Sequence, residues 1–315
     1  MTGHALPVGY DALRHGAGRV DRNGAVLEVS GPDAAAFLHG QLSADVESLA
    51  VGAGTEALLL SPKGRLVAVG YLLRTGDTRF AYVVDARVRD ATAERLVRFH
   101  LRVDCDIAGD DELGVWSVLG PAADAATAAA LGAAAVPPQE PLAVVAVPSL
   151  GDDAVAVRAA TGALAGIHLA AIAGEPDIPG AVSASRGAFD AVRVEHGVAL
   201  FGVDYDESTV PHDAGLVPRA VGLDKGCYVG QELIERIWSR GHANRTPRSV
   251  RIHAGEVPAP GAVVSAGDRE VGRLTTTAWC PAWDAPGGLG LLRIDVGAGA
   301  EVSVEGAAAT VVASG

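Results

Sequence analysis

The order of strand-like and helix-like patterns changes once along this chain, near residue 247, and that change limits what its 315 residues can fold into. Before it, apolar runs typical of strands alternate with segments at helical spacing, which is the pattern of an α+β region. From Arg248 onward, short apolar runs are separated by Gly, Pro and Asp without a helical period, as in a small β-barrel or sandwich. We therefore predict an α+β region over residues 1–246 and a C-terminal β-domain over residues 247–315.

Two local signals inside the α+β region predict particular elements. Thr55–Leu60 and Arg65–Leu73 are strand-like and are joined by the turn-forming sequence Ser-Pro-Lys-Gly at 61–64, which predicts a β-hairpin. A helix is predicted between Ser185, a good N-cap residue, and Gly197, which is typical of a helix C-terminus. Both predictions follow from local turn and capping chemistry.

The composition is that of an ordinary soluble globular protein. Hydrophobic residues make up 49% of the chain and aromatic residues only 4%, so the core must be built from Ala, Val and Leu. The net charge of −13 disfavours non-specific attraction to nucleic acid or to an anionic membrane. We therefore expect no direct nucleic-acid partner and no membrane partner.

Three further features bear on location and metal binding. The stretches without charged residues fall short of the roughly 18 to 20 apolar residues that a membrane-spanning helix needs. The first residues, Met-Thr-Gly-His-Ala-Leu-Pro-Val, lack the basic and apolar regions of a secretory signal. The three cysteines, Cys105, Cys227 and Cys280, are far apart and have no zinc-like spacing. We expect a cytoplasmic protein with no metal site.

Several enzyme classes are excluded by motifs that the chain lacks. It has no Gly-Lys dipeptide and hence no Walker A loop, and neither Gly-x-Ser-x-Gly nor His-Glu-x-x-His occurs. No dinucleotide-binding glycine fingerprint lies between a predicted strand and a predicted helix. The chemistry must therefore be sought in less common motifs.

The strongest local signal is Asp-Lys-Gly-Cys-Tyr-Val-Gly-Gln-Glu at residues 224–232. Apolar residues follow at helical spacing, so Cys227 is expected at or just before a helix N-terminus, with Lys225 two residues away. Both features favour the thiolate, which makes Cys227 the candidate catalytic thiol and Lys225 the residue that tunes it. The alternative is that Cys227 is a small buried filler, because free cysteine is among the most buried residue types.

Basic residues gather around this motif. Between Arg219 and Arg251, seven Lys or Arg residues stand against three Asp or Glu residues, a local balance of +4 that leaves the rest of the chain at −17. A positive region in an acidic protein focuses an anionic ligand. The alternative is that these arginines pair with acids elsewhere. The chain has only two lysines, Lys63 and Lys225, each followed by Gly, and we hypothesise that both positions need a compact ammonium rather than a guanidinium.

A second polar cluster, Arg-Val-Glu-His-Gly at 193–197, ends the helix predicted after Ser185. The carboxylate of Glu195 can accept two parallel hydrogen bonds from an amino-substituted heterocycle. The alternative is a surface salt bridge between Arg193 and Glu195.

Taken together, these segments resemble the YgfZ-type folate-binding proteins, relatives of the glycine-cleavage T-protein (aminomethyltransferase). The sequence Lys-Gly-Cys-Tyr-Val-Gly-Gln-Glu at 225–232 is similar to the signature of that family. Further segments match the family in order, and the resemblance covers most of the chain. These supporting segments are 37–46, 61–65, 193–197, 210–216 and 271–275.

The resemblance implies an α+β fold: a T-protein-like folate-binding region with a ferredoxin-like part, around a central opening, closed by a C-terminal β-barrel. It also implies tetrahydrofolate as the ligand, with Glu195 holding the pterin ring. Tyr82 and Asp85 match a folate-lining strand, although the T-protein usually has Asn where Asp85 stands. Tyr228 in the signature and Arg236 in the basic stretch complete the candidate cofactor-binding residues; the stretch would suit the anionic glutamate tail of folate.

One departure from the T-protein bears on activity. The aspartate that the T-protein uses for aminomethyl transfer is matched here by Ala68 and Val69, and neither can act as a base. Aminomethyl transfer of the T-protein kind is therefore not expected. Cys227, which the T-protein lacks, marks the YgfZ branch, whose members support assembly or repair of iron–sulfur clusters and thereby affect tRNA modification.

Three hypotheses follow from the resemblance. The first is a tetrahydrofolate-binding accessory protein whose partners are iron–sulfur client enzymes or cluster-assembly proteins. The second is a folate-dependent one-carbon transferase with an unknown acceptor. The third is a binding module that has lost folate chemistry and acts only on partner proteins.

Overall fold

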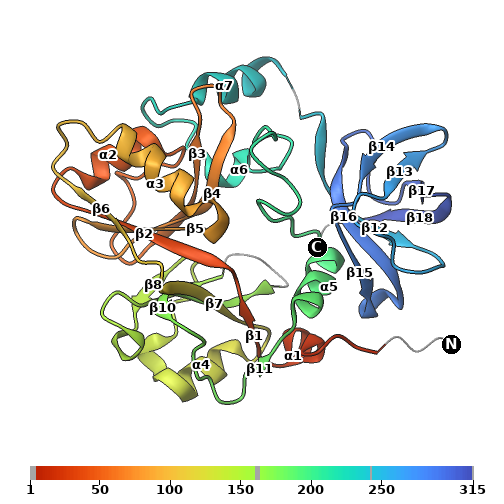
Figure 1. The fold of residues 1–315 in the computed structure, drawn as a ribbon, viewed down its shortest axis with the longest axis horizontal. Helices are drawn as coiled ribbons and strands as arrows, with labels where there is room; N and C mark the ends of the chain where they lie inside the picture. The colour runs from red at the N-terminus through yellow and green to blue at the C-terminus, as the bar shows by residue number, and fades with distance from the viewer. Residues whose placement is uncertain (1–4, 160–163, 242, 314–315) are drawn as a thin grey trace.

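The computed structural model describes residues 5–159, 164–241 and 243–313. Two β-sheets and a β-barrel lie at the corners of a triangle, with short helices and loops between them (Figure 1). The α+β content and the C-terminal barrel expected from the sequence are both present. No helix within the described ranges has the length and apolar content needed to cross a lipid bilayer.

The first sheet is antiparallel and has five strands in the order β3-β4-β5-β2-β6. Phe37, Leu38 and Leu96 pack on one of its faces from two covering helices. The predicted hairpin is confirmed as β3 and β4, paired from Gly54 to Leu73. The elements are β2 (Gly24–Ser30), α2 (Ala34–Gln41), β3 (Gly54–Leu60), β4 (Leu66–Arg74), β5 (Arg79–Asp85), α3 (Arg89–Arg98) and β6 (Asp106–Gly109).

The second sheet has six strands in the order β11-β1-β7-β10-β9-β8 and is antiparallel except for the β1–β11 pair. Ala123 and Ala126 of the alanine-rich helix pack against one face. On the other face, Val115 and Val157 meet Val26 and Val83 of the first sheet, so a shared apolar layer joins the two sheets. The elements are β1 (Gly18–Asp21), β7 (Leu113–Leu119), α4 (Ala123–Leu131), β8 (Val144–Ala146), β9 (Val155–Arg158), β10 (Gly166–Ala173) and β11 (Val182–Ser183).

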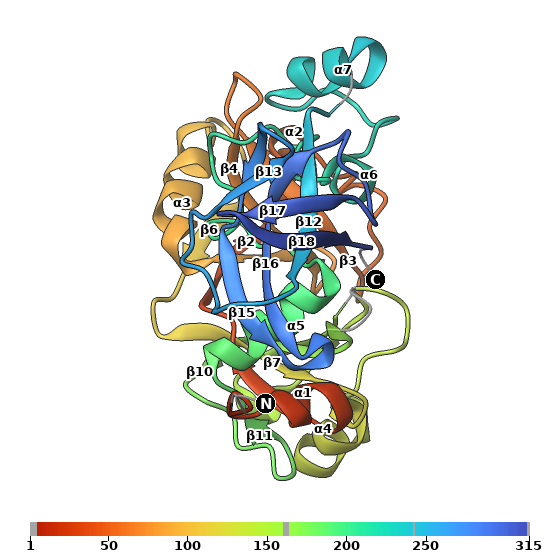
Figure 2. The same ribbon diagram turned by 90° about the vertical axis from the view of Figure 1, so that its right-hand side faces the viewer.

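The C-terminal part is a closed barrel. Its strands run in the order β12-β18-β17-β13-β14-β16, β12 also pairs with β16 and closes the ring, and β15 adds to β16. Figure 2 shows this barrel face on. Val250, Val264 and Leu292 are buried inside it. The strands are β12 (Arg245–Ile252), β13 (Val263–Ala266), β14 (Arg269–Arg273), β15 (Thr276–Cys280), β16 (Ala285–Arg293), β17 (Glu301–Val304) and β18 (Ala307–Val312).

Helix α5 connects the barrel to the rest of the molecule (Figure 2). As predicted, Ser185 caps its N-terminus by accepting from the Ala188 N–H at 3.2 Å, and Gly197 ends it in the left-handed conformation with φ of 70°. The remaining elements are α1 (Tyr10–His15), α5 (Arg186–His196), α6 (Val217–Ala220), α7 (Gln231–Arg240) and the 3₁₀ helices η1 (Ala86–Val88), η2 (Ala133–Ala135), η3 (Pro148–Leu150) and η5 (Pro281–Trp283).

A buried ion pair fastens α5 to the barrel. The side chains of Arg193 and Asp204 are both fully buried, and the guanidinium donates to Asp204 Oδ2 at 2.7 Å. The hydroxyls of Thr275 and Thr276 donate to the other carboxylate oxygen at 2.7 and 2.6 Å. The alternative of a surface salt bridge between Arg193 and Glu195 is therefore wrong, because Arg193 faces the interior.

Candidate functional site

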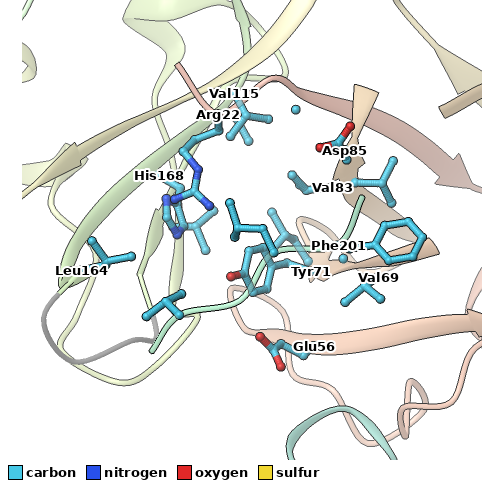
Figure 3. A pocket seen from close by; sticks show the side chains of 18 of the residues that line it. Arg22, Glu56, Val69, Tyr71, Val83, Asp85, Val115, Leu164, His168 and Phe201 are labelled. Carbon is cyan, nitrogen blue, oxygen red and sulfur yellow. The ribbon is translucent and has the colours of Figure 1, made fainter. Parts of the chain in front are cut away.

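A cavity of about 150 Å³ lies where the two sheets meet the segment that follows α5 (Figure 3). A cavity of about this volume in another protein binds benzene, so the space admits a six-membered ring. Its walls are largely apolar and come from β4, β5, β7, β9 and the 198–201 segment. They include Val69, Val83, Val115, Val157 and Phe201.

One wall carries a buried carboxylate. Glu56 on β3 is 9% exposed, and its Oε1 accepts a hydrogen bond from the guanidinium of Arg219 at 2.9 Å. The other oxygen, Oε2, is buried and has no hydrogen-bond partner among the described residues. Burial raises the pKa of Glu56, and the nearby Arg219 charge opposes that rise. Glu56 therefore presents an unused acceptor at the cavity wall.

Two aromatic side chains lie beside this carboxylate. Tyr71 on β4 is the cross-strand neighbour of Glu56, and its ring stacks on that of His168 with centroids 5.8 Å apart. His168 is hydrogen-bonded through Nδ1 to the hydroxyl of Ser117 at 2.7 Å. Burial lowers the pKa of His168 to about 3, helped by the charge of Arg22, so the imidazole is neutral at physiological pH.

Arg22 enters the same cavity from the link between β1 and β2. Its backbone N–H donates to the carbonyl of Val115 at 3.0 Å, and its guanidinium carbon lies 4.8 Å from the centre of the Phe189 ring. Figure 3 shows its side chain beside His168, directed into the cavity. Burial lowers the pKa of this guanidinium.

Of the residues assigned to cofactor binding from the sequence, Asp85 is the one that lines this cavity in the described part of the chain. Its carboxylate accepts two hydrogen bonds from the Arg87 guanidinium, at 2.8 and 2.7 Å, and one from the Arg87 N–H at 2.9 Å. Tyr82 is fully buried on the opposite, helix-covered face of β5, where its hydroxyl donates to the carbonyl of Ala57 at 3.0 Å. Strand alternation explains the difference, because Tyr82 and Val83 must point to opposite faces.

Glu195 is also absent from the cavity walls of the described structure. Both its oxygens accept from the Tyr10 hydroxyl at 2.9 Å, and Oε1 also accepts from the Ala282 N–H at 2.9 Å. Burial raises the pKa of this carboxyl, whereas these hydrogen bonds oppose the rise. Glu195 on α5 is thus hydrogen-bonded to both α1 and η5. It lies about one helical turn before Val198, which lines the cavity.

The Cys227 segment lies apart from the cavity, at the end of α2. Cys227 is exposed, so the alternative of a buried filler is wrong. Helix α7 begins later than the apolar spacing suggested, with Gly230 at its N-cap, because Gly230 takes the left-handed conformation. A Cβ on the adjacent Gly226 would lie 3.7 Å from His39 Nε2, so the segment passes beside that imidazole.

Lys225 is used within this segment. Its ammonium donates to the carbonyls of His39, Leu42 and Ala44, the last two at 2.7 and 2.9 Å, and lies 4.9 Å from the Tyr228 ring centre. An ammonium has three protons, and here all three go to main-chain oxygens at the C-terminal end of α2. Burial lowers the pKa of Lys225 to about 8.

The two remaining candidates also lie in this region. Tyr228 is 9% exposed, and its N–H donates to the side-chain oxygen of Gln231 at 2.9 Å. Arg236 is exposed on α7 and pairs with Glu232 one turn earlier at 2.9 Å. In the described structure neither lines the cavity, so the thiol segment and the cavity are two separate features.

Sequence reasoning missed five polar residues of the cavity. Two of them could have been recognised in the sequence, because Glu56 is the one charged residue within its strand and His168 interrupts an apolar run. Arg22 could not, because it stands in the polar turn Asp-Arg-Asn. The missed residues are Arg22, Glu56, Tyr71, His168 and Arg219.

Comparison with known proteins supports the two-part architecture. The GCVT N-terminal domain family matches residues 8–141, and the CAF17 C-terminal beta-barrel domain family matches residues 248–314. The crystal structure of glycine cleavage system aminomethyltransferase T from Bartonella henselae superposes with a TM-score of 0.82 at 22% identity, covering 96% of this chain and 87% of that one. The predicted fold class, a T-protein-like fold with a C-terminal β-barrel, is confirmed.

Curated relatives include aminomethyltransferases and a YgfZ protein. The aminomethyltransferase of Bordetella petrii is 31% identical over 72% of this chain, and the match spans 65% of that protein's length. The tRNA-modifying protein YgfZ of Cronobacter sakazakii is 28% identical over 75% of this chain and 71% of its own length. The match to the CAF17 barrel family and the YgfZ relative point to the YgfZ family. The chain belongs to the YgfZ family of the glycine-cleavage T-protein superfamily.

Proposed function

We propose that this protein is a cytoplasmic, tetrahydrofolate-binding accessory protein that supports iron–sulfur cluster assembly or repair in client enzymes and through them affects tRNA modification. Membership of the YgfZ family supports the proposal, and a relative carries the name tRNA-modifying protein. The three cysteines are unpaired, which suits a reducing compartment.

The main observation in support of folate binding is Glu56 Oε2, a buried oxygen without a hydrogen-bond partner among the described residues. A buried acceptor without a partner is unfavourable, so a ligand that donates to it is stabilised. The amino-pyrimidinone edge of a pterin offers neighbouring N–H donors, and the apolar walls around Val69 and Phe201 suit a ring. Tetrahydrofolate, when bound, supplies a carrier for one-carbon units. We propose Glu56, rather than Glu195, as the carboxylate that meets the pterin.

Equilibrium binding of tetrahydrofolate, measured anaerobically by calorimetry, tests this assignment. The wild-type protein is expected to bind one equivalent. Glu56→Gln, which keeps shape but replaces a charged acceptor oxygen with an amide, is expected to weaken binding roughly tenfold or more. Glu195→Gln is the matched control and is expected to weaken it less. If Glu195→Gln has the larger effect at equal folded fraction, the pterin lies against Glu195 and the assignment fails.

The glutamate tail provides a second test. In the proposal the tail lies toward the basic stretch, where Arg236 is exposed and paired with Glu232 alone. Polyglutamylated tetrahydrofolate should bind more tightly than the monoglutamate, and Arg236→Gln should reduce that difference. Equal affinity for both forms would show that the basic stretch does not contribute to folate binding.

Cys227 is proposed as the reactive thiol, binding iron or sulfur transiently. Its exposure makes it accessible to a partner protein. The chain has three cysteines, so it cannot supply the four thiolates of a permanent protein-only cluster by itself. Cys227→Ala should lower the activity of cluster-containing enzymes in cells, whereas Cys105→Ala, which changes a buried cysteine, should not. Full activity with Cys227→Ala would remove the thiol from the mechanism.

The positions that match the T-protein aspartate are apolar in space as well as in sequence. Ala68 is fully buried, and Val69 lines the cavity. Neither accepts a proton, which argues against aminomethyl transfer of the T-protein kind. One observation favours the alternative, a one-carbon transferase with an unknown acceptor: Glu56 is an ionisable carboxylate at the cavity. Product formed from tetrahydrofolate and a donor amine in vitro would support that alternative.

A further inference from the structure

Arg22 brings a positive charge to the central cavity that no acidic side chain of the described residues neutralises by a direct ion pair. Its guanidinium carbon lies 4.8 Å from the centre of the Phe189 ring, and among the described residues the guanidinium makes no hydrogen bond. The other arginines near it are engaged elsewhere: Arg186 and Arg193 both pair with Asp190, at 3.0 and 2.8 Å. Arg22 is therefore the cavity guanidinium whose donors are free for an acceptor from outside the described chain.

The groups around Arg22 do not supply that acceptor. His168 is hydrogen-bonded through Nδ1 to Ser117, and neither of its ring nitrogens is hydrogen-bonded to Arg22 in the described structure. Asp85 lies on the same cavity wall but is used by Arg87. A guanidinium removed from water without an acceptor is unfavourable, so a ligand that presents a carbonyl or anionic oxygen here is stabilised.

Glu56 and Arg22 together define what such a ligand looks like. Tyr71 lies between them: it is the cross-strand neighbour of Glu56, and the charges of both residues act on its hydroxyl. Figure 3 shows the carboxylate and the guanidinium on different sides of the Tyr71 ring. The cavity thus offers an acceptor to one edge of a ring and a donor to another. A 2-amino-4-oxo-pyrimidine ring carries both kinds of group, N–H donors at the 2-amino group and N3 and a carbonyl oxygen at position 4.

We propose that Arg22 is a specificity-determining residue that donates to the 4-oxo oxygen of a pterin whose amino edge is bound by Glu56. The cavity therefore selects 4-oxo pterins over 4-amino pterins, because a 4-amino group presents N–H donors to a side chain that can only donate. This inference rests on the proposed function, since it takes a reduced folate as the ligand.

The test compares, by anaerobic equilibrium binding, tetrahydrofolate with tetrahydroaminopterin, in which a 4-amino group replaces the 4-oxo oxygen and the neighbouring ring nitrogen N3 carries no hydrogen. The wild-type protein is expected to prefer tetrahydrofolate by roughly tenfold or more, the size of a charge-assisted hydrogen bond. Arg22→Met should reduce the preference by weakening the binding of tetrahydrofolate and not that of tetrahydroaminopterin, and Arg22→Lys should restore part of it. Arg79→Met, an exposed arginine paired with Glu28 and Asp153, is the matched control. Thermal unfolding of each variant confirms that it is folded.

The outcomes separate the two proposals. No binding of tetrahydrofolate to the folded wild-type protein contradicts the proposed function and with it this inference. Binding of tetrahydrofolate with an unchanged preference in Arg22→Met, or with no preference in the wild type, contradicts the inference alone. A smaller preference in Arg22→Met, partly restored in Arg22→Lys, supports it.

Discussion

Lys225 shows why one residue of the signature must be a lysine. Its ammonium has three protons and donates to three main-chain carbonyls at the C-terminal end of α2, an arrangement that a planar guanidinium does not match. This geometry agrees with the compact-ammonium hypothesis at this position. It also means that Lys225 organises the segment carrying Cys227, because the donors that would stabilise a thiolate are already used.

We predict that Lys225→Met lowers the free energy of unfolding by about 1–3 kcal/mol, because it leaves the carbonyls without their charged donor. Lys225→Arg should be destabilising too. Urea denaturation measures both, and Lys63→Met provides the control, since Lys63 is exposed in the hairpin turn and is also followed by Gly. Equal stability of Lys225→Arg and the wild type would refute the compact-ammonium account.

His168 makes a prediction about pH. Its pKa is about 3 in the folded protein and near 6.5 when unfolded, so between these values the unfolded chain binds a proton that the folded protein does not. Stability therefore falls as the pH drops below 6.5, by about 2 kcal/mol from this group at pH 5. His168→Gln, which keeps a polar group beside Ser117, should show a shallower decline between pH 7 and pH 4. Parallel stability curves for the two proteins would contradict the prediction.

At the scale of elements, two glycines hold the Cys227 segment against the β3–β4 hairpin. Gly230 has a φ of +86°, and a Cβ there would lie 2.6 Å from the carbonyl oxygen of Ser61. Gly64, at the hairpin turn, has a φ of +71°, and a Cβ there would lie 2.5 Å from Leu233 Cβ. The hairpin predicted from the sequence is thus the surface on which the segment before α7 rests.

Replacing Gly230 by alanine should therefore lower the free energy of unfolding by more than backbone strain alone would. Gly261→Ala is the matched control, because Gly261 has a φ of +97° and open space around it. We expect the control to lose about 1–2 kcal/mol from strain alone and Gly230→Ala to lose a further 1–3 kcal/mol from the clash. Chemical denaturation of both variants decides this. Similar losses would show that the close approach to Ser61 is unimportant.

Several elements could be predicted because their determinants are local. Ser185 and Gly197 bound α5 through capping chemistry, and Ser-Pro-Lys-Gly closes the hairpin, wherever these segments lie in the molecule. The side chains of the cavity could not be found this way. Arg22, Glu56 and His168 lie on segments that only tertiary packing brings together, and the face on which Tyr82 points depends on strand register. Family resemblance predicted the fold, and the residues Tyr82 and Glu195 that it assigns to folate binding do not line the described cavity.

At the scale of the whole molecule, the barrel is joined to the α+β region by a buried charge network. Removing one partner of a buried ion pair leaves the other charge uncompensated. Asp204→Ala should therefore destabilise the protein by about 3–5 kcal/mol, because Arg193 stays buried. Asp295→Ala, which breaks exposed pairs with Arg269 and Arg293, should leave stability unchanged. Denaturant unfolding compares them, and equal losses would contradict the assigned role of the network.

The separation between the cavity and Cys227 has a functional consequence for the whole protein. The proposed pterin site and the exposed thiol are formed by different residues, so each can be removed by substitution without changing the other. Cys227→Ala should leave tetrahydrofolate affinity unchanged. A large change in affinity would show that the two sites act as one.

The most direct test of the account is whether tetrahydrofolate binds in the cavity between the two sheets. Val69 lines that cavity, whereas Val97 is 57% exposed on α3, so Val69→Trp fills the cavity and Val97→Trp adds the same side chain at the surface. Anaerobic calorimetry should show binding by the wild type and Val97→Trp and none by folded Val69→Trp. Undiminished binding by Val69→Trp, or no binding by the wild type, would contradict the central claim.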